Sequence, residues 1–221
     1  VLSKLINRHD PIIFDVGSNY GSSIVDFKKI WPNSKIHAFE PQLELKENLL
    51  EVSRRYENVI INMKAAGDKT QIASFYTHEQ LSAQAGFNQI NFESKDSINL
   101  SKFNEIELNE YKNSNNIHRQ VEVIKMSEYV NENQINEIDL LKIDTQGFEP
   151  EVLKGFESKL STVKVVLCEL MFYDFYDRSL SFSDIEKFLL PFGFKLYDIS
   201  HISKNPMNGR TDWVDVIYLR N

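Results

Sequence analysis

Short apolar runs alternate with stretches of helical periodicity in the first 65 residues. The run at 11–16 is almost continuously apolar, which is typical of a strand buried on both faces. The same pattern predicts strands at 35–40 and 58–63. Between them, apolar residues recur every three or four positions from Ile24 and from Leu45, which predicts two helices. A β-α-β-α-β run of this length implies a parallel sheet with right-handed crossovers.

Residues 78–120 interrupt this alternation. They follow a short strand expected at 73–77 and are rich in Asn, Ser and Glu. A loop this long inside a compact domain usually has a function of its own. We interpret it as an insertion that covers or shapes the substrate site, with one short helix. A plain surface elaboration is the alternative.

The pattern in the second half of the chain predicts the rest of the sheet. Further strands are expected at 121–126, 138–144, 163–171, 194–199 and 213–219. One helix begins near Pro150, and another follows Ser183, whose spacing to Glu186 is that of a capping box. The Asn-Gly pair at 208–209 is a strong turn signal, so the last two strands are expected to pair antiparallel. We therefore predict one α/β domain spanning 1–221.

Composition narrows the class of protein. The 221 residues suit one domain, and 25 Lys and Arg against 32 Asp and Glu give a net charge of -7, which disfavours nucleic-acid binding. No apolar run approaches the roughly 20 residues of a membrane span. Cys168 is the sole cysteine, which excludes an internal disulfide and a multi-Cys zinc site. The first residues carry no signal-peptide pattern, so we expect a cytoplasmic protein.

The loop after the first strand is the first candidate for a ligand site. Ligands of open parallel sheets bind beyond the carboxyl ends of the strands, and this loop contains Gly17 and Gly21. Gly17 permits a tight turn, and Gly21 lets the next helix begin close to the strand. Glu40 ends the second strand, where a carboxylate accepts hydrogen bonds from ribose hydroxyls. The combination predicts a nucleoside-containing cofactor.

Charge and spacing favour one cofactor over another. A dinucleotide loop needs G-x-G-x-x-G, whereas Gly17 and Gly21 are spaced G-x-x-x-G. Asp15 stands just before the turn, where its charge opposes a phosphate and favours a cationic ligand. S-adenosylmethionine carries an ammonium, a sulfonium and no phosphate, so we expect it rather than NAD. An NAD-dependent oxidoreductase is the alternative, and helix capping is the alternative role of Asp15.

Two carboxylates flank the turn after the strand at 138–144. Asp144 ends that strand, and Glu149 immediately precedes Pro150. Both can face the pocket, where a carboxylate accepts a proton from a reacting hydroxyl or helps to hold the sulfonium. Helix capping is the alternative for Glu149, and a structural cap or donor-orienting role is the alternative for Asp144.

The same segments resemble the FkbM-type methyltransferases. The resemblance rests on DVGSNYG at 15–21, FEP at 39–41, DLLKIDTQGFE at 139–149 and VLKG at 152–155, and it runs from about residue 11 to 200. It implies a class I methyltransferase (Rossmann-like) fold, with a mostly parallel seven-stranded sheet and helices on both faces. It also implies S-adenosylmethionine as donor and a hydroxyl of a sugar, polyketide or other small-molecule or glycan acceptor.

The resemblance also places Asp144 and Glu149 in the site, without settling their roles. Met126-Ser127 stands where the family often has Leu-Asp, and the insertion matches no family motif. The residues expected to bind the donor are Asp15, Gly17, Ser18, Asn19, Gly21, Glu40, Pro41 and Ala66.

The acceptor side is expected around Glu169 and the aromatic segment that follows it. An acidic residue inside an apolar strand needs a partner, which can be the acceptor, a metal shared with Asp144, or a lysine. Aromatic faces stack on sugar rings, so Glu169, Phe172, Tyr173 and Tyr176 are the candidates for acceptor binding. A hydrophobic plug or the contact of a homodimer is the alternative. The histidines are scattered, and we predict no metal. A non-catalytic binding domain is a third hypothesis.

Overall fold

The computed structural model describes residues 1–78, 82–98 and 107–220. Its strands are β1 (Ile12–Val16), β2 (Lys35–Phe39), β3 (Val59–Asn62), β4 (Ala65–Gly67), β5 (Gln71–Thr77), β6 (Ile117–Lys125), β7 (Ile138–Ile143), β8 (Val163–Met171), β9 (Phe194–Lys204) and β10 (Thr211–Arg220). Its α-helices are α1 (Leu2–Leu5), α2 (Ser22–Ile30), α3 (Lys46–Arg55), α5 (Leu108–Asn113), α6 (Met126–Glu132), α7 (Glu149–Phe156) and α8 (Phe182–Leu189). Short 3₁₀ helices are η1 (Leu43–Leu45), η2 (Ser82–Gln84), η3 (Glu157–Thr162) and η4 (Leu190–Phe192).

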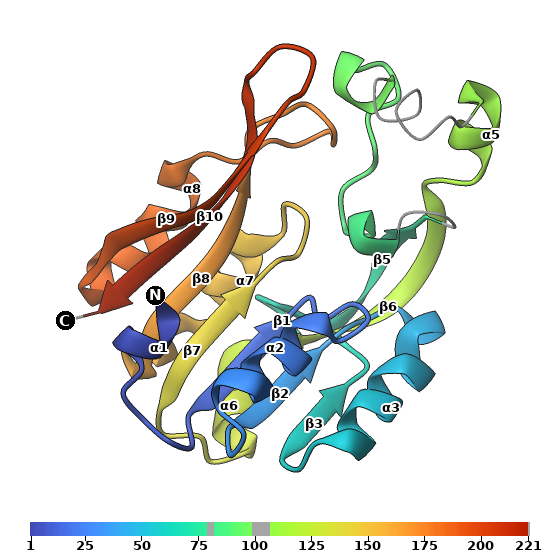
Figure 1. The fold of residues 1–221 in the computed structure, drawn as a ribbon. Helices are drawn as coiled ribbons and strands as arrows, with labels where there is room; N and C mark the ends of the chain where they lie inside the picture. The colour runs from blue at the N-terminus through green and yellow to red at the C-terminus, as the bar shows by residue number, and fades with distance from the viewer. Residues whose placement is uncertain (79–81, 99–106, 221) are drawn as a thin grey trace.

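Seven strands form the main sheet, in the order β3-β2-β1-β7-β8-β10-β9. The first five are parallel to one another, and β10 runs antiparallel to both β8 and β9 (Figure 1). The mostly parallel seven-stranded sheet and the C-terminal hairpin are therefore confirmed. The strand order reverses between β1 and β7, and ligands of open α/β sheets bind at such a reversal, beyond the carboxyl ends of the strands.

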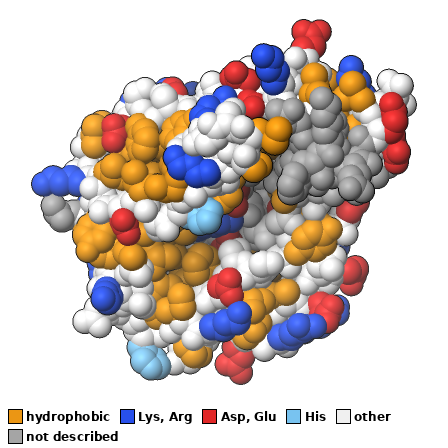
Figure 2. All heavy atoms as spheres, turned by 45° about the horizontal axis from the view of Figure 1, so that its top comes forward, with side chains coloured by type: hydrophobic (Ala, Val, Ile, Leu, Met, Phe, Trp, Pro, Cys, Tyr) orange, Lys and Arg blue, Asp and Glu red, His pale blue; other side chains and the backbone are white. Residues whose placement is uncertain are grey.

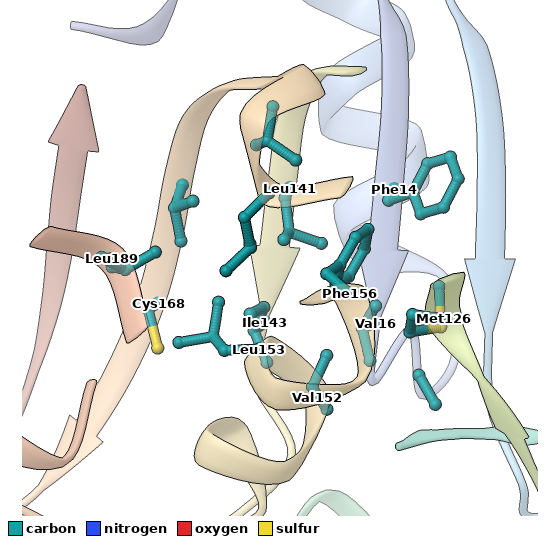
Figure 3. Close-up of a cluster of buried hydrophobic side chains, with 14 of the residues drawn as sticks. Phe14, Val16, Met126, Leu141, Ile143, Val152, Leu153, Phe156, Cys168 and Leu189 are labelled. Carbon is teal, nitrogen blue, oxygen red and sulfur yellow. The ribbon is translucent and has the colours of Figure 1, made fainter. Parts of the chain in front are cut away.

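Helices cover both faces of this sheet, as predicted. On one face α1, α2 and α3 pack against β1, β2 and β7, and the buried side chains include Ile24, Phe27 and Leu49. On the other face α6, α7 and α8 pack through residues such as Leu153 and Phe156, which point at the strands in Figure 3. Burying an aromatic or aliphatic side chain of this size contributes roughly 1.5–3 kcal/mol. The two apolar layers thus hold the carboxyl ends of β1, β2, β7 and β8 at one edge.

A second sheet of three strands, in the order β4-β6-β5, lies beside the first. It contains the strands predicted at 73–77 and 121–126, which the sequence pattern did not separate from the main sheet. In β6 the buried Val121 and Val123 alternate with exposed residues, as expected of a strand with one solvated face. Strand β4 and helix α6 were not predicted, and α6 begins at Met126, where a strand end was expected.

The predicted capping box at Ser183 and Glu186 is wrong by two residues. The cap is Ser181, and its side chain and backbone exchange hydrogen bonds with Asp184. Phe182, the first residue of the helix, stacks on Phe172, with ring centroids 5.8 Å apart. None of the described helices combines the length and the apolar composition that crossing a membrane requires.

Candidate functional site

A partly open cavity lies at the strand-order reversal, over the carboxyl ends of β1, β2, β7 and β8. Figure 2 looks onto this edge and shows the surface hollowed there. Five of the residues predicted to bind the donor line the cavity: Gly17, Asn19, Glu40, Pro41 and Ala66. Asp144 and Glu169 line it too. The structure therefore brings together residues more than 150 positions apart in the sequence.

Gly17 is required by the protein backbone as well as by the space it leaves for a ligand. Its φ is +81°, and a Cβ atom at this position would lie 1.8 Å from the carbonyl oxygen of Asp144. The amide groups of Gly17 and Ser18 donate to the carbonyl oxygen of Phe39 at 3.0 and 3.1 Å. The loop is thus fixed between β2 and β7. The sequence argument, which considered only the turn and the approach of a ligand, missed the crowding by β7.

Glu40 is a buried carboxylate held in one orientation. Its Oε2 accepts a hydrogen bond from the Asn19 amide at 2.9 Å, and its Oε1 accepts one from the Gln42 amide at 3.0 Å. The residue is 3% exposed, and burial raises the pKa of its carboxyl group, against the effect of these hydrogen bonds. Each carboxylate oxygen can accept more than one hydrogen bond. The side chain can therefore bind two ribose hydroxyls from a fixed position.

Asp15 has a different position from the one we expected. It is fully buried, does not line the cavity, and its Oδ2 accepts a hydrogen bond from the Ser23 hydroxyl at 2.5 Å. Its Oδ1 lies 3.4 Å from the ammonium of Lys142. Asp15 is therefore paired with a lysine of the protein, and it is not among the described residues that line the cavity, where we expected it to meet a cationic ligand.

Lys142 connects the donor loop to Asp144. Its Nζ donates to the carbonyl oxygen of Gly17 at 2.9 Å and lies 3.3 Å from Oδ2 of Asp144. Burial by itself would lower the pKa of this lysine, but the carboxylates of Asp144 and Asp15 outweigh it and raise the pKa. The lysine therefore stays charged between two aspartates.

Ser18 and Gly21 shape the loop without lining the cavity. The buried Ser18 hydroxyl donates to the carbonyl oxygen of Asp15 at 2.8 Å. Gly21 has a φ of +84° at the start of α2, where an added Cβ would meet Leu49 and Val52 of α3. Both residues help to set the path of the backbone beside the cavity.

One glutamine joins the two carboxylates on the other side of the cavity. The amide nitrogen of Gln146 donates to Oδ1 of Asp144 at 3.0 Å and to Oε2 of Glu169 at 2.9 Å. Burial raises the pKa of Glu169 well above its ordinary value, and the negative charges of Asp144, Glu149 and Asp215 raise it further. Gln146 itself has a left-handed backbone, with φ of +57°.

Glu149 lies beneath the cavity and does not line it. Its Oε1 accepts hydrogen bonds from the amide and hydroxyl of Thr145 at 2.8 and 3.0 Å, and from the Gly147 amide at 3.3 Å. Within the described part of the chain its Oε2 has no hydrogen-bond partner. Complete burial raises the pKa of this carboxyl group to about 7. Glu149 is the first residue of α7, and it orders the preceding loop rather than reaching the cavity.

The predicted aromatic wall of Phe172, Tyr173 and Tyr176 is absent from the described lining. Tyr176 is buried, and its hydroxyl donates to Oε1 of Gln146 at 2.8 Å. Phe172 stacks on α8, and Tyr173 packs against Phe175. Of the four acceptor candidates, Glu169 alone is among the described residues that line the cavity. The packing of this segment agrees better with the hydrophobic plug that was the alternative.

Several lining residues were not predicted. Gln42, Phe75 and Gln146 line the cavity, and so do Ala85 and Phe87 from the insertion. The ring of Phe87 stacks on that of Phe148, with ring centroids 4.0 Å apart, beside the loop that carries Asp144. The expectation that the insertion shapes the site is therefore supported for its described residues. The role of Lys142 was also not predicted. A signal for it was present in the sequence, because Lys142 is a basic residue inside the mostly apolar strand at 138–144.

No group of three or more His, Cys, Asp or Glu side chains in the described ranges has an arrangement that could hold a metal ion. The single cysteine, Cys168, is buried and forms no disulfide.

Comparison with known proteins decides the family. The profile of the Methyltransferase FkbM domain matches residues 15–196. The chain belongs to the FkbM methyltransferase family. This methyltransferase is 22% identical over 177 residues to the 2-O-methyltransferase NoeI of Sinorhizobium fredii, a match that covers 80% of the chain and 70% of NoeI.

Solved structures agree on the fold. The fibrillarin pre-rRNA processing protein of Methanococcus jannaschii has a TM-score of 0.53 at 13% identity, over 97% of this chain and 68% of that one. TrmK of M. capricolum, in complex with S-adenosylhomocysteine, has a TM-score of 0.51 at 10% identity, over 100% of this chain and 66% of that one. The methyltransferase thus has the class I fold, and S-adenosylmethionine is its methyl donor.

Proposed function

We propose that this methyltransferase acts on a hydroxyl oxygen of an uncharged, hydroxyl-rich acceptor, such as a sugar unit of a glycan. One observation carries the proposal: the cavity that contains Glu40 also contains two carboxylates, Asp144 and Glu169, fixed by one glutamine. A hydroxyl needs a hydrogen-bond acceptor that can take its proton as the new bond forms. The name of NoeI, a 2-O-methyltransferase, agrees with oxygen as the acceptor atom.

The donor would be held along the loop after β1 and the end of β2. Glu40 would bind the ribose hydroxyls, and the backbone of Gly17 and Asn19 would follow the donor along the loop. Pro41 and Ala66 supply apolar surface to the same cavity. The sulfonium supplies the methyl group when the donor is bound. The protein contributes alignment of the hydroxyl oxygen with the methyl carbon, because the transfer is an in-line displacement.

The charge of the cavity supports a neutral acceptor. Its described lining contains the carboxylates of Glu40, Asp144 and Glu169, and no Lys, Arg or His side chain. The nearby ammonium of Lys142 is engaged by two aspartates, and the Lys142 side chain is 13% exposed. A phosphorylated or carboxylated acceptor would meet uncompensated negative charge, whereas a sugar offers hydroxyl donors to these carboxylates. A homodimer, a cytoplasmic location and the absence of a nucleic-acid partner stay predictions.

A labelled-methyl assay tests the proposal. The protein is incubated with S-adenosylmethionine that carries a tritiated methyl group, together with a neutral glycoside panel, the matching phosphorylated glycosides and an RNA oligonucleotide. We expect label in an alkali-stable methyl ether of a neutral glycoside. Label only in RNA, in a base-labile methyl ester or on nitrogen would contradict the proposal. The Asp144→Asn variant serves as the control for site-dependent transfer.

A further inference from the structure

The two carboxylates on the acceptor side of the cavity have unequal charge surroundings. Asp144 lies 3.3 Å from the ammonium of Lys142, which is itself fixed by Asp15 and by the Gly17 carbonyl oxygen. Glu169 has no such partner: in the described ranges no basic side chain lies within ion-pairing distance of it. Among the described residues, the side chain that hydrogen-bonds to its carboxylate is the neutral amide of Gln146.

The groups that face Glu169 are mostly negative or neutral. Asp215 of β10 stands directly opposite it in the antiparallel pair of β8 and β10, an arrangement that is unfavourable for two like charges. The other titratable groups around it are Lys142 of β7, Asp144 directly after β7, Glu149 of α7, the neighbouring Cys168 of β8, and Tyr173 and Tyr176 of the loop after β8. Lys142 is the single cation of this set, and two aspartates already share it.

Gln146 holds the two carboxylates at a fixed separation. The Tyr176 hydroxyl lies within hydrogen-bond distance of Oε1 of Gln146, at 2.8 Å, and of the backbone carbonyl oxygen of Gln84, at 2.9 Å. Because ionised carboxylates only accept hydrogen bonds, the amide nitrogen of Gln146 faces the two carboxylates and gives one hydrogen to each. The backbone carbonyl oxygen of Gln146 accepts a hydrogen bond from the side-chain amide of Asn88 in the insertion, at 3.1 Å. Asp144 and Glu169 are therefore a preorganised pair of carboxylates, held in place by the same glutamine.

We propose that Glu169 accepts the proton of the acceptor hydroxyl, while Lys142 keeps Asp144 as a charged positioning residue. The inference rests on the proposed transfer to oxygen. As the hydroxyl oxygen bonds to the methyl carbon, the sulfur–carbon bond breaks and its electron pair stays on sulfur. The hydroxyl proton passes to the Glu169 carboxylate and later to water.

The direction of proton transfer follows from electrostatics. Protonating Asp144 would remove an ion pair and leave the Lys142 ammonium with Asp15 as its remaining partner. Protonating Glu169 instead relieves its repulsion by Asp144 and Asp215. Two neighbouring acids with opposed surroundings commonly divide the acid–base and charge-stabilising roles in this way. The raised pKa of Glu169 agrees with this assignment.

The pH profile of kcat, at saturating donor, distinguishes the roles. The wild type should gain activity with rising pH as Glu169 ionises. Glu169→Gln should lower kcat by roughly 10²-fold or more, remove that limb, and leave the Kd for S-adenosylhomocysteine nearly unchanged. Asp144→Asn should keep the limb but move it to lower pH, because a neighbouring negative charge is gone, and it should weaken binding of the donor product.

Variants at two further residues act on Glu169 from outside the cavity lining. Asp215→Asn should move the limb to lower pH with little change in the plateau, because it removes the opposing charge on β10. Lys142→Met should move the limb to higher pH, because a neighbouring positive charge is gone. Lys142→Arg keeps that charge, so its limb should lie close to that of the wild type. An unchanged pH limb in both Glu169→Gln and Asp215→Asn would overturn the assignment. If Glu169→Gln does not fold, an unshifted limb in Asp215→Asn overturns it alone.

A measurement without turnover separates this inference from the proposed function. Carbon-13 NMR of the unliganded protein follows each glutamate carboxyl group through its titration. The signal lost in Glu169→Gln should titrate well above an ordinary glutamate and should shift down in Asp215→Asn. Glu149→Gln assigns the neighbouring signal expected near 7. Failure to methylate any hydroxyl would contradict the proposed function. A Glu169 carboxyl group that titrates like an ordinary glutamate would contradict the inference alone.

Discussion

Replacing Glu40 by glutamine tests the donor site with a change of one atom. The carboxylate accepts the amide of Asn19 through one oxygen and the amide of Gln42 through the other. In Glu40→Gln the side-chain nitrogen must face one of these two donors, and the negative charge is lost. The ribose hydroxyls then meet a weaker and partly reversed hydrogen-bonding group.

The size of the effect follows from hydrogen bonds to a charged, buried acceptor. Such bonds contribute roughly 1.5–3 kcal/mol each, and ordinary ones about 1 kcal/mol. We expect the donor to bind about 1 to 3 kcal/mol more weakly, which is roughly a 5- to 150-fold rise in Kd. The unpaired backbone donor should also lower the free energy of unfolding of the unliganded protein by about 1–3 kcal/mol.

Calorimetric titration with S-adenosylhomocysteine measures the change in Kd. Glu47→Gln is the matched control, because Glu47 is an exposed residue in the first turn of α3 and should leave Kd unchanged. Urea unfolding of all three proteins shows whether each is folded under the binding conditions. A folded Glu40→Gln protein whose Kd lies within twofold of the wild type would refute the ribose assignment.

Two further predictions concern stability. The pKa of Glu149 is raised from 4.5 to about 7 in the folded state, so the folded protein binds a proton that the unfolded chain lacks between these values. The free energy of unfolding should therefore fall by up to roughly 3 kcal/mol as pH rises from 4.5 to 7. Urea unfolding at pH 5 and pH 8 measures this fall in the free energy of unfolding, and the fall should be smaller in Glu149→Gln than in the wild type. An equal fall in the two proteins would contradict the prediction. A Cβ at Gly155 of α7 would lie 1.9 Å from the Gly67 carbonyl oxygen of β4, so Gly155→Ala should cost about 1–3 kcal/mol of overpacking. An unchanged denaturation midpoint would show that α7 and β4 are not packed this closely.

The sequence was sufficient for the parts of the fold that depend on local periodicity. The buried strands at 11–16, 138–144 and 163–171 are recognisable because they lie in the middle of the sheet and are apolar on both faces. Since parallel strands end at the same edge, Gly17 and Glu40 could be placed together without knowing the register. The same reasoning brought Asp144 and Glu169 to that edge.

What the sequence could not supply depends on register and side-chain direction. The neutralisation of Asp15 requires Asp15 and Lys142 to be partners across β1 and β7, which periodicity does not specify. The link from Asp144 to Glu169 requires the left-handed backbone of Gln146. Strand β4 is three residues long and too short to leave a periodic pattern. Among the aromatic residues after β8, Tyr176 forms a backbone bridge with Ile90 of the insertion, and Phe172 stacks on Phe182 of α8. Periodicity does not specify these contacts between distant segments.

The central claim is that the cavity beyond β1, β2 and β7 holds S-adenosylmethionine. The most direct measurement is a calorimetric titration of the wild-type protein with S-adenosylhomocysteine, and with NAD as the competing nucleotide cofactor. We predict one site with a Kd on the order of micromolar for S-adenosylhomocysteine and no measurable heat for NAD. Tight binding of NAD, or no binding of S-adenosylhomocysteine by the folded protein, would contradict the account.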